Sequence, residues 1–91
     1  MTDESIRKFK SVADVAILGS VSKAASLNKI SQSAMSQGIQ AAEREYGHRI
    51  FDRSARPVKP TALGELYVQF CIGIVAAKRT LDRVTADQVA K

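Results

Sequence analysis

The sequence is poor in the residues that mark secreted and membrane-spanning proteins. It contains one cysteine, no tryptophan, two prolines and 5% aromatic residues. Because Cys71 is alone, no intramolecular disulfide can form, which is typical of a reducing compartment. No charged start leads into an apolar signal segment, and no apolar run reaches membrane-spanning length. We therefore expect a cytoplasmic protein without a membrane partner.

Patterns typical of catalysis and metal binding are also missing. No serine has a plausible histidine and carboxylate partner, and there is no glycine-rich phosphate loop or metal-ligand spacing. His48 is the single histidine, for which we expect a structural or surface role. Cys71 follows Phe70 and is expected to be a buried apolar group rather than a redox switch. The sequence thus predicts no enzyme, no metal and no cofactor.

The charge is positive and unevenly distributed. Lysine and arginine number 14 against 9 aspartate and glutamate residues, which gives a net charge of +5 and a pI near 9.7. Residues 20–60 hold seven basic and three acidic side chains, whereas residues 1–19 are balanced. A basic middle segment favours a polyanionic partner.

Apolar periodicity predicts three helices in the first half of the chain. Over residues 3–18, one face carries Ile6, Phe9, Val12 or Ala13, Ala16 and Ile17. Gly19 is expected to end this helix, and Ser20 to cap a second helix over residues 21–27. Ser31 is expected to cap a third helix over residues 32–46, whose buried stripe is Met35, Ile39, Ala42 and Tyr46.

Residues 49–60 predict a small basic hairpin. Arg49–Arg53 is typical of a short strand and 54–57 of a turn. Val58–Pro60 is expected to return as an edge strand, because proline cannot donate to a sheet ladder.

Thr61 is expected to cap a long helix that continues towards residue 91. Its apolar residues form two sets with a spacing of seven, offset by four, as in a coiled-coil seam: Leu63, Phe70, Ala77 and Val84, and Tyr67, Ile74 and Leu81. The remaining domain is too small to cover this seam. We therefore expect a homodimer through these residues.

The predicted fold is mainly α, with a DNA-binding domain at 1–60 and a dimerisation helix at 61–91. Two short helices joined by a tight turn, the second with a polar face, are typical of a helix-turn-helix. Gln37 or Gln40 can bond an adenine edge in the major groove. Arg53, Arg56 and Lys59 of the hairpin can meet phosphate charge on the backbone or in a minor groove.

Residues 19–66 resemble the N-terminal domain of LysR-type transcriptional regulators of bacteria. The matching stretches are Gly19–Ala25, Ile30–Gln37, Ile39 with Glu43, Gly47, Ile50–Arg53 and Pro60–Glu65. The resemblance implies a winged helix-turn-helix of three helices and a β-hairpin wing, followed by a dimerising linker helix. It also implies that helix 32–46 enters the major groove. The resemblance implies that five residues of this helix face the duplex: Gln32, Ser33, Ser36, Gln37 and Gln40. It also implies that Arg53 supports the contact between the wing and the DNA backbone.

Full-length members of that family carry a C-terminal effector-binding domain and often form tetramers. That domain is absent from these residues, so we expect an excised fragment or a naturally short relative. The implied function is sequence-specific binding to an interrupted palindrome in double-stranded DNA, on the bacterial nucleoid. The alternative is a protein-interaction module whose long helix is the functional surface and which does not bind DNA specifically.

Four residues depart from the family pattern. Asn28 stands where the family usually has a buried leucine, with Leu27 one place early, which predicts a second helix that is rotated or ends sooner. Ala42 replaces a usual leucine, so Tyr46 or a shifted helix is expected to fill the space. His48 replaces a small aliphatic residue, and Gln40 stands where arginine is common, which changes the expected base preference.

Overall fold

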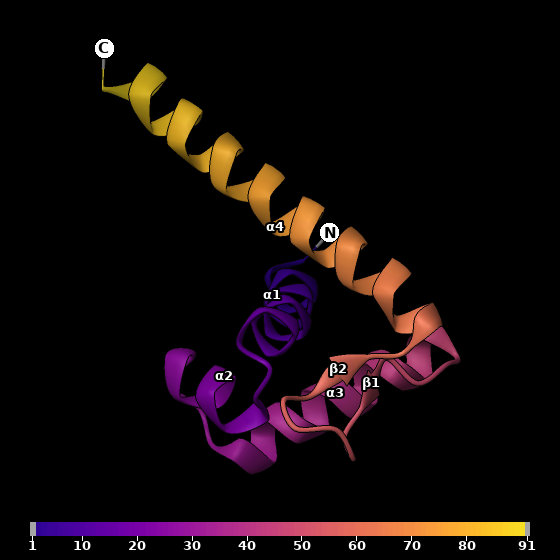
Figure 1. Ribbon diagram of the computed structural model, residues 1–91. Helices are drawn as coiled ribbons and strands as arrows, with labels where there is room; N and C mark the ends of the chain where they lie inside the picture. Colours follow the sequence, from indigo (N-terminus) through magenta and orange to yellow (C-terminus); the bar gives the residue numbers. More distant parts are fainter. Residues whose placement is uncertain (1, 91) are drawn as a thin grey trace.

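The computed structural model describes residues 2–90. The elements in chain order are α1 (Asp3–Leu18), α2 (Val21–Leu27), α3 (Gln32–Tyr46), β1 (Phe51–Asp52), β2 (Lys59–Pro60) and α4 (Ala62–Val89). Figure 1 shows α1, α2, α3 and the hairpin gathered beneath one half of α4, whose other half extends away. The predicted fold class, a winged helix-turn-helix followed by a long helix, is confirmed.

The second, third and fourth helices begin at the predicted caps, and Thr2, which was not predicted, caps the first. The side-chain oxygens of four residues accept a hydrogen bond from the backbone N–H three positions later: Thr2, Ser20, Ser31 and Thr61. Gly19 and Gly47 end α1 and α3 in the left-handed conformation, with φ of 66° and 81°. Local chemistry therefore fixes where each helix starts and stops.

Helix α1 is the centre of the core, because it contacts α2, α3 and α4. Val12, Ala13 and Val15 are buried against these helices, and Ile39 and Phe51 reach the same core from α3 and β1. The predicted apolar face of α1 was wrong at its end. Ile17 is 68% exposed, because the covering helices bury α1 as far as Val15 and leave Ile17 and Leu18 at its end open.

The hairpin is shorter than predicted. Its two strands pair antiparallel over two residues each, Phe51 with Pro60 and Asp52 with Lys59. The predicted strand at 49–53 shrinks to 51–52, and that at 58–60 to 59–60. Prolines at positions 57 and 60 have no N–H to donate, which limits the ladder.

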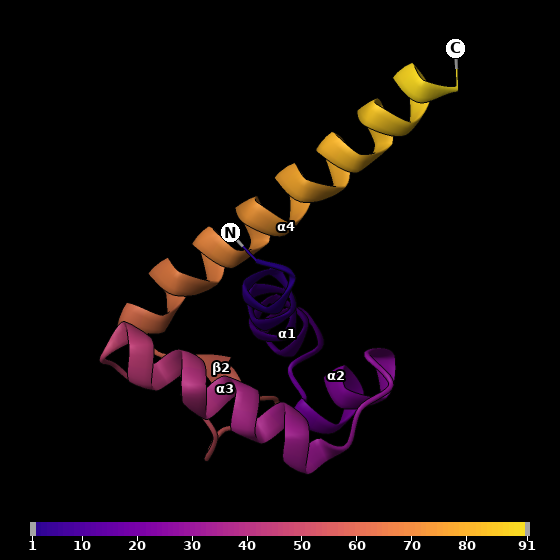
Figure 2. The same ribbon diagram turned by 180° about the vertical axis from the view of Figure 1, so that it is seen from behind.

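Helix α4 has two parts with different surroundings. Gly64, Val68 and Cys71 are buried against the core, as predicted for the cysteine. From Arg79 onward every residue up to Ala90 is exposed, and this part projects from the domain (Figure 2). Within residues 2–90 no helix combines the length and apolar character needed to cross a membrane.

Candidate nucleic-acid interface

Helix α3 presents an amide- and hydroxyl-bearing face to solvent. Met35, Ile39 and Ala42 are buried and hold the opposite face against the core, as predicted. The residues expected on the open face are exposed (Gln32, Ser33, Gln37 and Gln40) or partly buried (Ser36). Their amides can donate and accept at base edges, and they stand on a helix that its own packing keeps in place.

A cleft of about 300 Å³ lies between this face, the start of α2 and the wing. Its polar lining comes from three elements: Ser20 and Ser22 near the start of α2, Gln32 and Ser36 from α3, and Arg53 and Arg56 from the wing. The sequence had pointed to the last four of these residues. It missed Ser20 and Ser22 as interface residues, although Ser20 follows Gly19 as a recognisable cap.

Arg53 has an unmet hydrogen-bonding group at this cleft. Its Nη2 atom is shielded from solvent and has no hydrogen-bond partner within residues 2–90. A buried donor without an acceptor is costly, and a guanidinium suits the paired oxygens of a phosphate. Arg56 donates from Nη1 to the carbonyls of Arg53 and Ala55, the latter at 3.0 Å. Arg53 and Arg56 together give the lining of the cleft a positive charge.

The three carboxylates of residues 20–60 are held by donors of the chain itself. Glu43 Oε2 accepts from the backbone N–H of Ile50 at 2.8 Å and of Phe51 at 3.4 Å, which ties α3 to the wing. Glu45 pairs with Lys8 of α1. The Ser54 hydroxyl and N–H bond to Asp52, at 2.6 and 3.0 Å, and lower the pKa of that carboxyl. None of the three lines the cleft, so its basic character is not offset.

The wing is fastened to the end of α1, and its two ends are fastened to each other at the cap of α4. The N–H of Val58 donates to the carbonyl of Gly19 at 2.9 Å, and that of Thr61 to the carbonyl of Ile50 at 2.9 Å. The Thr61 hydroxyl donates to the carbonyl of Arg49 at 2.6 Å.

Lys59 is exposed on β2 but does not line the cleft. Ser33, Gln37 and Gln40 likewise lie on the α3 surface outside it.

The apolar seam predicted along α4 is largely open. Leu63, Phe70, Ala77, Leu81 and Val84 are exposed, whereas Tyr67 and Ile74 are half-buried on the domain's own side. Leu66, which the heptad pattern missed, is 67% exposed and lies on the same open face. Leu66 follows Leu63 by three residues and precedes Phe70 by four, so a search for helical spacings of three and four would have included Leu66 in the seam.

Two titratable side chains of α4 are held neutral. Burial raises the pKa of the Cys71 thiol to about 12, and burial likewise raises the pKa of the Tyr67 hydroxyl to about 12. Across the part of the chain that the structure describes, no three His, Cys, Asp or Glu side chains are grouped to hold a metal ion. His48 is exposed, with its ring 5.4 Å from that of Tyr46.

Residues 6–65 match the family described as bacterial regulatory helix-turn-helix proteins of the LysR family. The chain belongs to this family. A curated relative, the HTH-type transcriptional regulator TfdT of Cupriavidus pinatubonensis, is 40% identical over 63 residues, which cover 69% of this chain and 28% of TfdT. The LysR-family chain thus spans well under half the length of that relative.

Solved structures of LysR-type proteins share the whole fold. The BenM DNA-binding domain in complex with catB site 1 DNA superposes with a TM-score of 0.87 and 28% identity, over 94% of this chain and 97% of that domain. Full-length LysG of Corynebacterium glutamicum with bound effector Arg gives a TM-score of 0.84 and 26% identity, over 93% of this chain and 29% of LysG. The helix-turn-helix, wing and long helix are therefore a shared LysR-type architecture.

Proposed function

We propose that this LysR-family chain binds double-stranded DNA sequence-specifically, as the homodimeric DNA-binding part of a bacterial transcription regulator. Helix α3 lies in the major groove, and the wing, residues 49–60, lies on the backbone or in a minor groove. The observation that carries this proposal is the exposed amide- and hydroxyl-bearing face of α3 beside a cleft that Arg53 and Arg56 line. The arginines of the cleft supply positive charge for DNA phosphates, while the adjoining face reads bases.

The two kinds of contact have separate sources in the chain. Arg53, Arg56 and Lys59 supply charge for phosphates, which makes the affinity fall with salt concentration. Gln32, Ser33, Ser36, Gln37 and Gln40 supply the discrimination between bases. The likeness to BenM, whose DNA-binding domain is solved in complex with catB site 1 DNA, supports DNA binding by this chain.

The open apolar face of α4 supports the homodimer. Three side chains of this face are well exposed in the isolated chain: Leu66 at 67%, Phe70 at 48% and Leu81 at 61%. A second copy of α4 covers this row in a self-complementary contact, as two-fold symmetry requires. Two recognition helices then face successive major grooves, so the operator is an interrupted palindrome. Such a dimer works in the cytoplasm on the nucleoid, and a longer form of the chain can pair further into tetramers.

Selection of bound sequences from a random duplex pool at near-physiological salt tests the proposal. Enrichment of an interrupted palindrome, bound by two chains, is the expected result. Salt-sensitive binding without enrichment contradicts sequence recognition by α3. A dimer that binds no duplex at any salt concentration contradicts the whole proposal and favours the protein-interaction module, with the open face of α4 as its surface.

A further inference from the structure

The turn between α2 and α3 lacks a hydrophobic anchor. Only residues 28–31 separate the two helices. The apolar side chains on either side of Asn28 are open to solvent, Leu27 at 58% and Ile30 at 42%. Lys29 has a φ of 57°, which is uncommon for a residue other than glycine. Apolar packing therefore does not determine the path of this turn.

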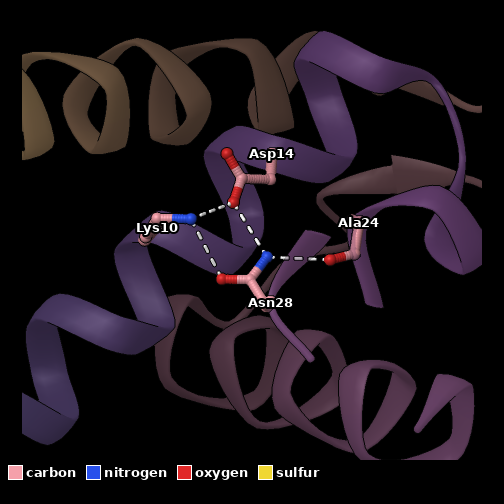
Figure 3. A network of polar contacts seen from close by, with 4 residues as sticks. All are labelled: Lys10, Asp14, Ala24 and Asn28. Atoms are coloured by element: carbon pink, nitrogen blue, oxygen red, sulfur yellow. Dashed lines mark hydrogen bonds and ion pairs between the residues drawn. The ribbon is translucent and has the colours of Figure 1, made fainter. Parts of the chain in front are cut away.

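Backbone bonds hold the turn locally, from the N–H groups of Lys29 and Ile30 to the carbonyls of Ser26 and Ala25. A polar network at Asn28 ties it to α1 (Figure 3). The Asn28 amide donates to the carbonyl of Ala24 at 2.8 Å and to Asp14 Oδ2 at 2.9 Å. Its oxygen accepts from Lys10 Nζ at 3.0 Å, and Lys10 also pairs with Asp14 at 2.7 Å. Asp14 is only 9% exposed. Helix α1 is thus joined to the C-cap residue of α2 by directional bonds around a buried charge.

We propose that Asn28, held by Asp14 and Lys10, is a positioning residue that fixes the start of α3 and so controls discrimination between DNA sequences. The inference rests on the proposed DNA-binding function. Asn28 caps the C-terminus of α2, and three residues later Ser31 caps α3. Over so short a turn, a change in the direction of the chain at Asn28 reaches Gln32 directly.

The wing does not depend on this network. Arg53 and Arg56 stand on a segment fastened to α1 and α3 through Gly19 and Glu43, remote in sequence from the turn. Release of Asn28 therefore moves the base-reading residues of the first turn of α3 and leaves the wing's phosphate contacts in place. Discrimination falls, and affinity for DNA of arbitrary sequence is retained.

The test compares dissociation constants of the 91-residue chain for the selected duplex and for a scrambled duplex of equal length. The ratio that measures discrimination is the dissociation constant for the scrambled duplex divided by that for the selected duplex. In Asp14→Asn and Asn28→Ala this ratio should fall about tenfold, as expected for the loss of one good base contact. The loss should come from the selected duplex alone. Ser26→Ala, an exposed change on α2, should leave the ratio unchanged.

Asp14→Asn is the sharper variant, because it keeps the shape of the side chain and removes a negative charge. That charge change alone strengthens binding to every duplex, so a loss confined to the selected duplex reports position rather than charge. If Asn28→Ala fails to fold, as judged by circular dichroism, Asp14→Asn decides the question. When Asn28→Ala and Asp14→Asn both fold, the variant that carries both substitutions should lose no more discrimination than either single variant. The reason is that each single substitution already breaks the same network.

A purely structural role predicts a different result. Partial unfolding weakens binding to both duplexes by the same factor, so the ratio stays constant. An unchanged ratio in folded Asp14→Asn overturns the inference and leaves the proposed function intact. A native chain that prefers no duplex over any other overturns the proposed function itself, and the two failures are thereby distinguished.

Discussion

At the residue scale, Gln37 and Arg53 represent two kinds of contact in the proposed interface. Gln37 is exposed on α3, whereas Arg53 is partly buried and lines the cleft. Their side chains differ in what they can distinguish. An amide pairs with the donor and acceptor pattern of one base, whereas a guanidinium meets a phosphate that every base pair carries.

We expect Gln37→Ala to cost about 1–3 kcal/mol at a single base position of the operator and nothing on random DNA. Arg53→Ala should weaken all duplexes alike and reduce the slope of log K against log salt by about 1. Fluorescence anisotropy at several salt concentrations measures both effects. Gln69→Ala is the matched control, because it removes an exposed amide from α4. Equal losses on operator and random DNA for Gln37→Ala would contradict this division.

Cys71 should react slowly with alkylating reagents in the folded chain. Its side chain is fully buried, and its pKa is raised from 9.0 to about 12, so at pH 8 the thiolate is about a thousandfold scarcer than in the unfolded chain. Iodoacetamide labelling followed by mass spectrometry, with and without denaturant, measures the difference. Rapid labelling of the folded chain would show that the site opens readily.

The same shift makes stability depend on alkaline pH. Because the folded pKa of Cys71 lies above the unfolded value, its stabilising contribution is complete below pH 9 and is lost as the pH rises towards 12. Tyr67, with its pKa raised from 10.0 to about 12, adds to the loss above pH 10. Urea titrations between pH 8 and 11 should show stability falling with pH, and less steeply in Cys71→Ala. An equal slope in that variant would assign the effect to other groups.

At the element scale, the placement of α4 depends on close contact with the wing. A Cβ built at Gly64 would lie 1.9 Å from the carbonyl oxygen of Ile50, so no side chain fits without movement of the backbone. Helix α3 also contacts α4. The Tyr46 hydroxyl donates to the carbonyl of Leu63 at 2.7 Å, and the Tyr46 ring lies 4.9 Å from the ring of Tyr67. Tyr46 thus joins α3 to α4.

Gly64→Ala should therefore destabilise the fold by about 3 kcal/mol, at the upper end of the cost of overpacking. Gly38→Ala is the matched control, because a Cβ there meets nothing within 4 Å. It should stabilise α3 by about 0.5–1 kcal/mol, since alanine favours a helix interior over glycine. Thermal unfolding followed by circular dichroism measures both, and a tolerated Gly64→Ala would mean that α4 can shift away from the wing.

At the scale of the whole molecule, self-association should depend on the open face of α4. Leu66 is 67% exposed in the isolated chain, so its replacement removes no contact within the domain core. We expect Leu66→Glu to weaken the homodimer by about two orders of magnitude, because two-fold symmetry counts the loss of about 1.5 kcal/mol or more twice. Analytical ultracentrifugation measures the change.

Arg83→Gln is the control for that experiment. It alters the net charge by the same amount and lies at an exposed position off the apolar row. A homodimer equally strong in Leu66→Glu would place the contact elsewhere. In the expected case, the monomeric variant should also lose affinity for a palindrome while its binding to a single half-site is retained.

The sequence by itself determined the helix boundaries and the order of elements. Caps such as Ser31 and Gly47 act on backbone groups within four residues, so they operate whatever lies around them. The buried stripe of α3 was equally readable, because a period of 3.6 is a property of the helix alone. The polar face that forms most of the candidate interface followed from the same period.

Only the tertiary structure decided which apolar side chains are covered and which polar groups meet. Ile17 and Leu66 are exposed and Asp14 is buried because neighbouring elements cover one side of a helix and not another. The cleft at Arg53 and the network at Asn28 each join segments that are remote in sequence. Such contacts depend on the packing angles of whole helices, which no local pattern encodes.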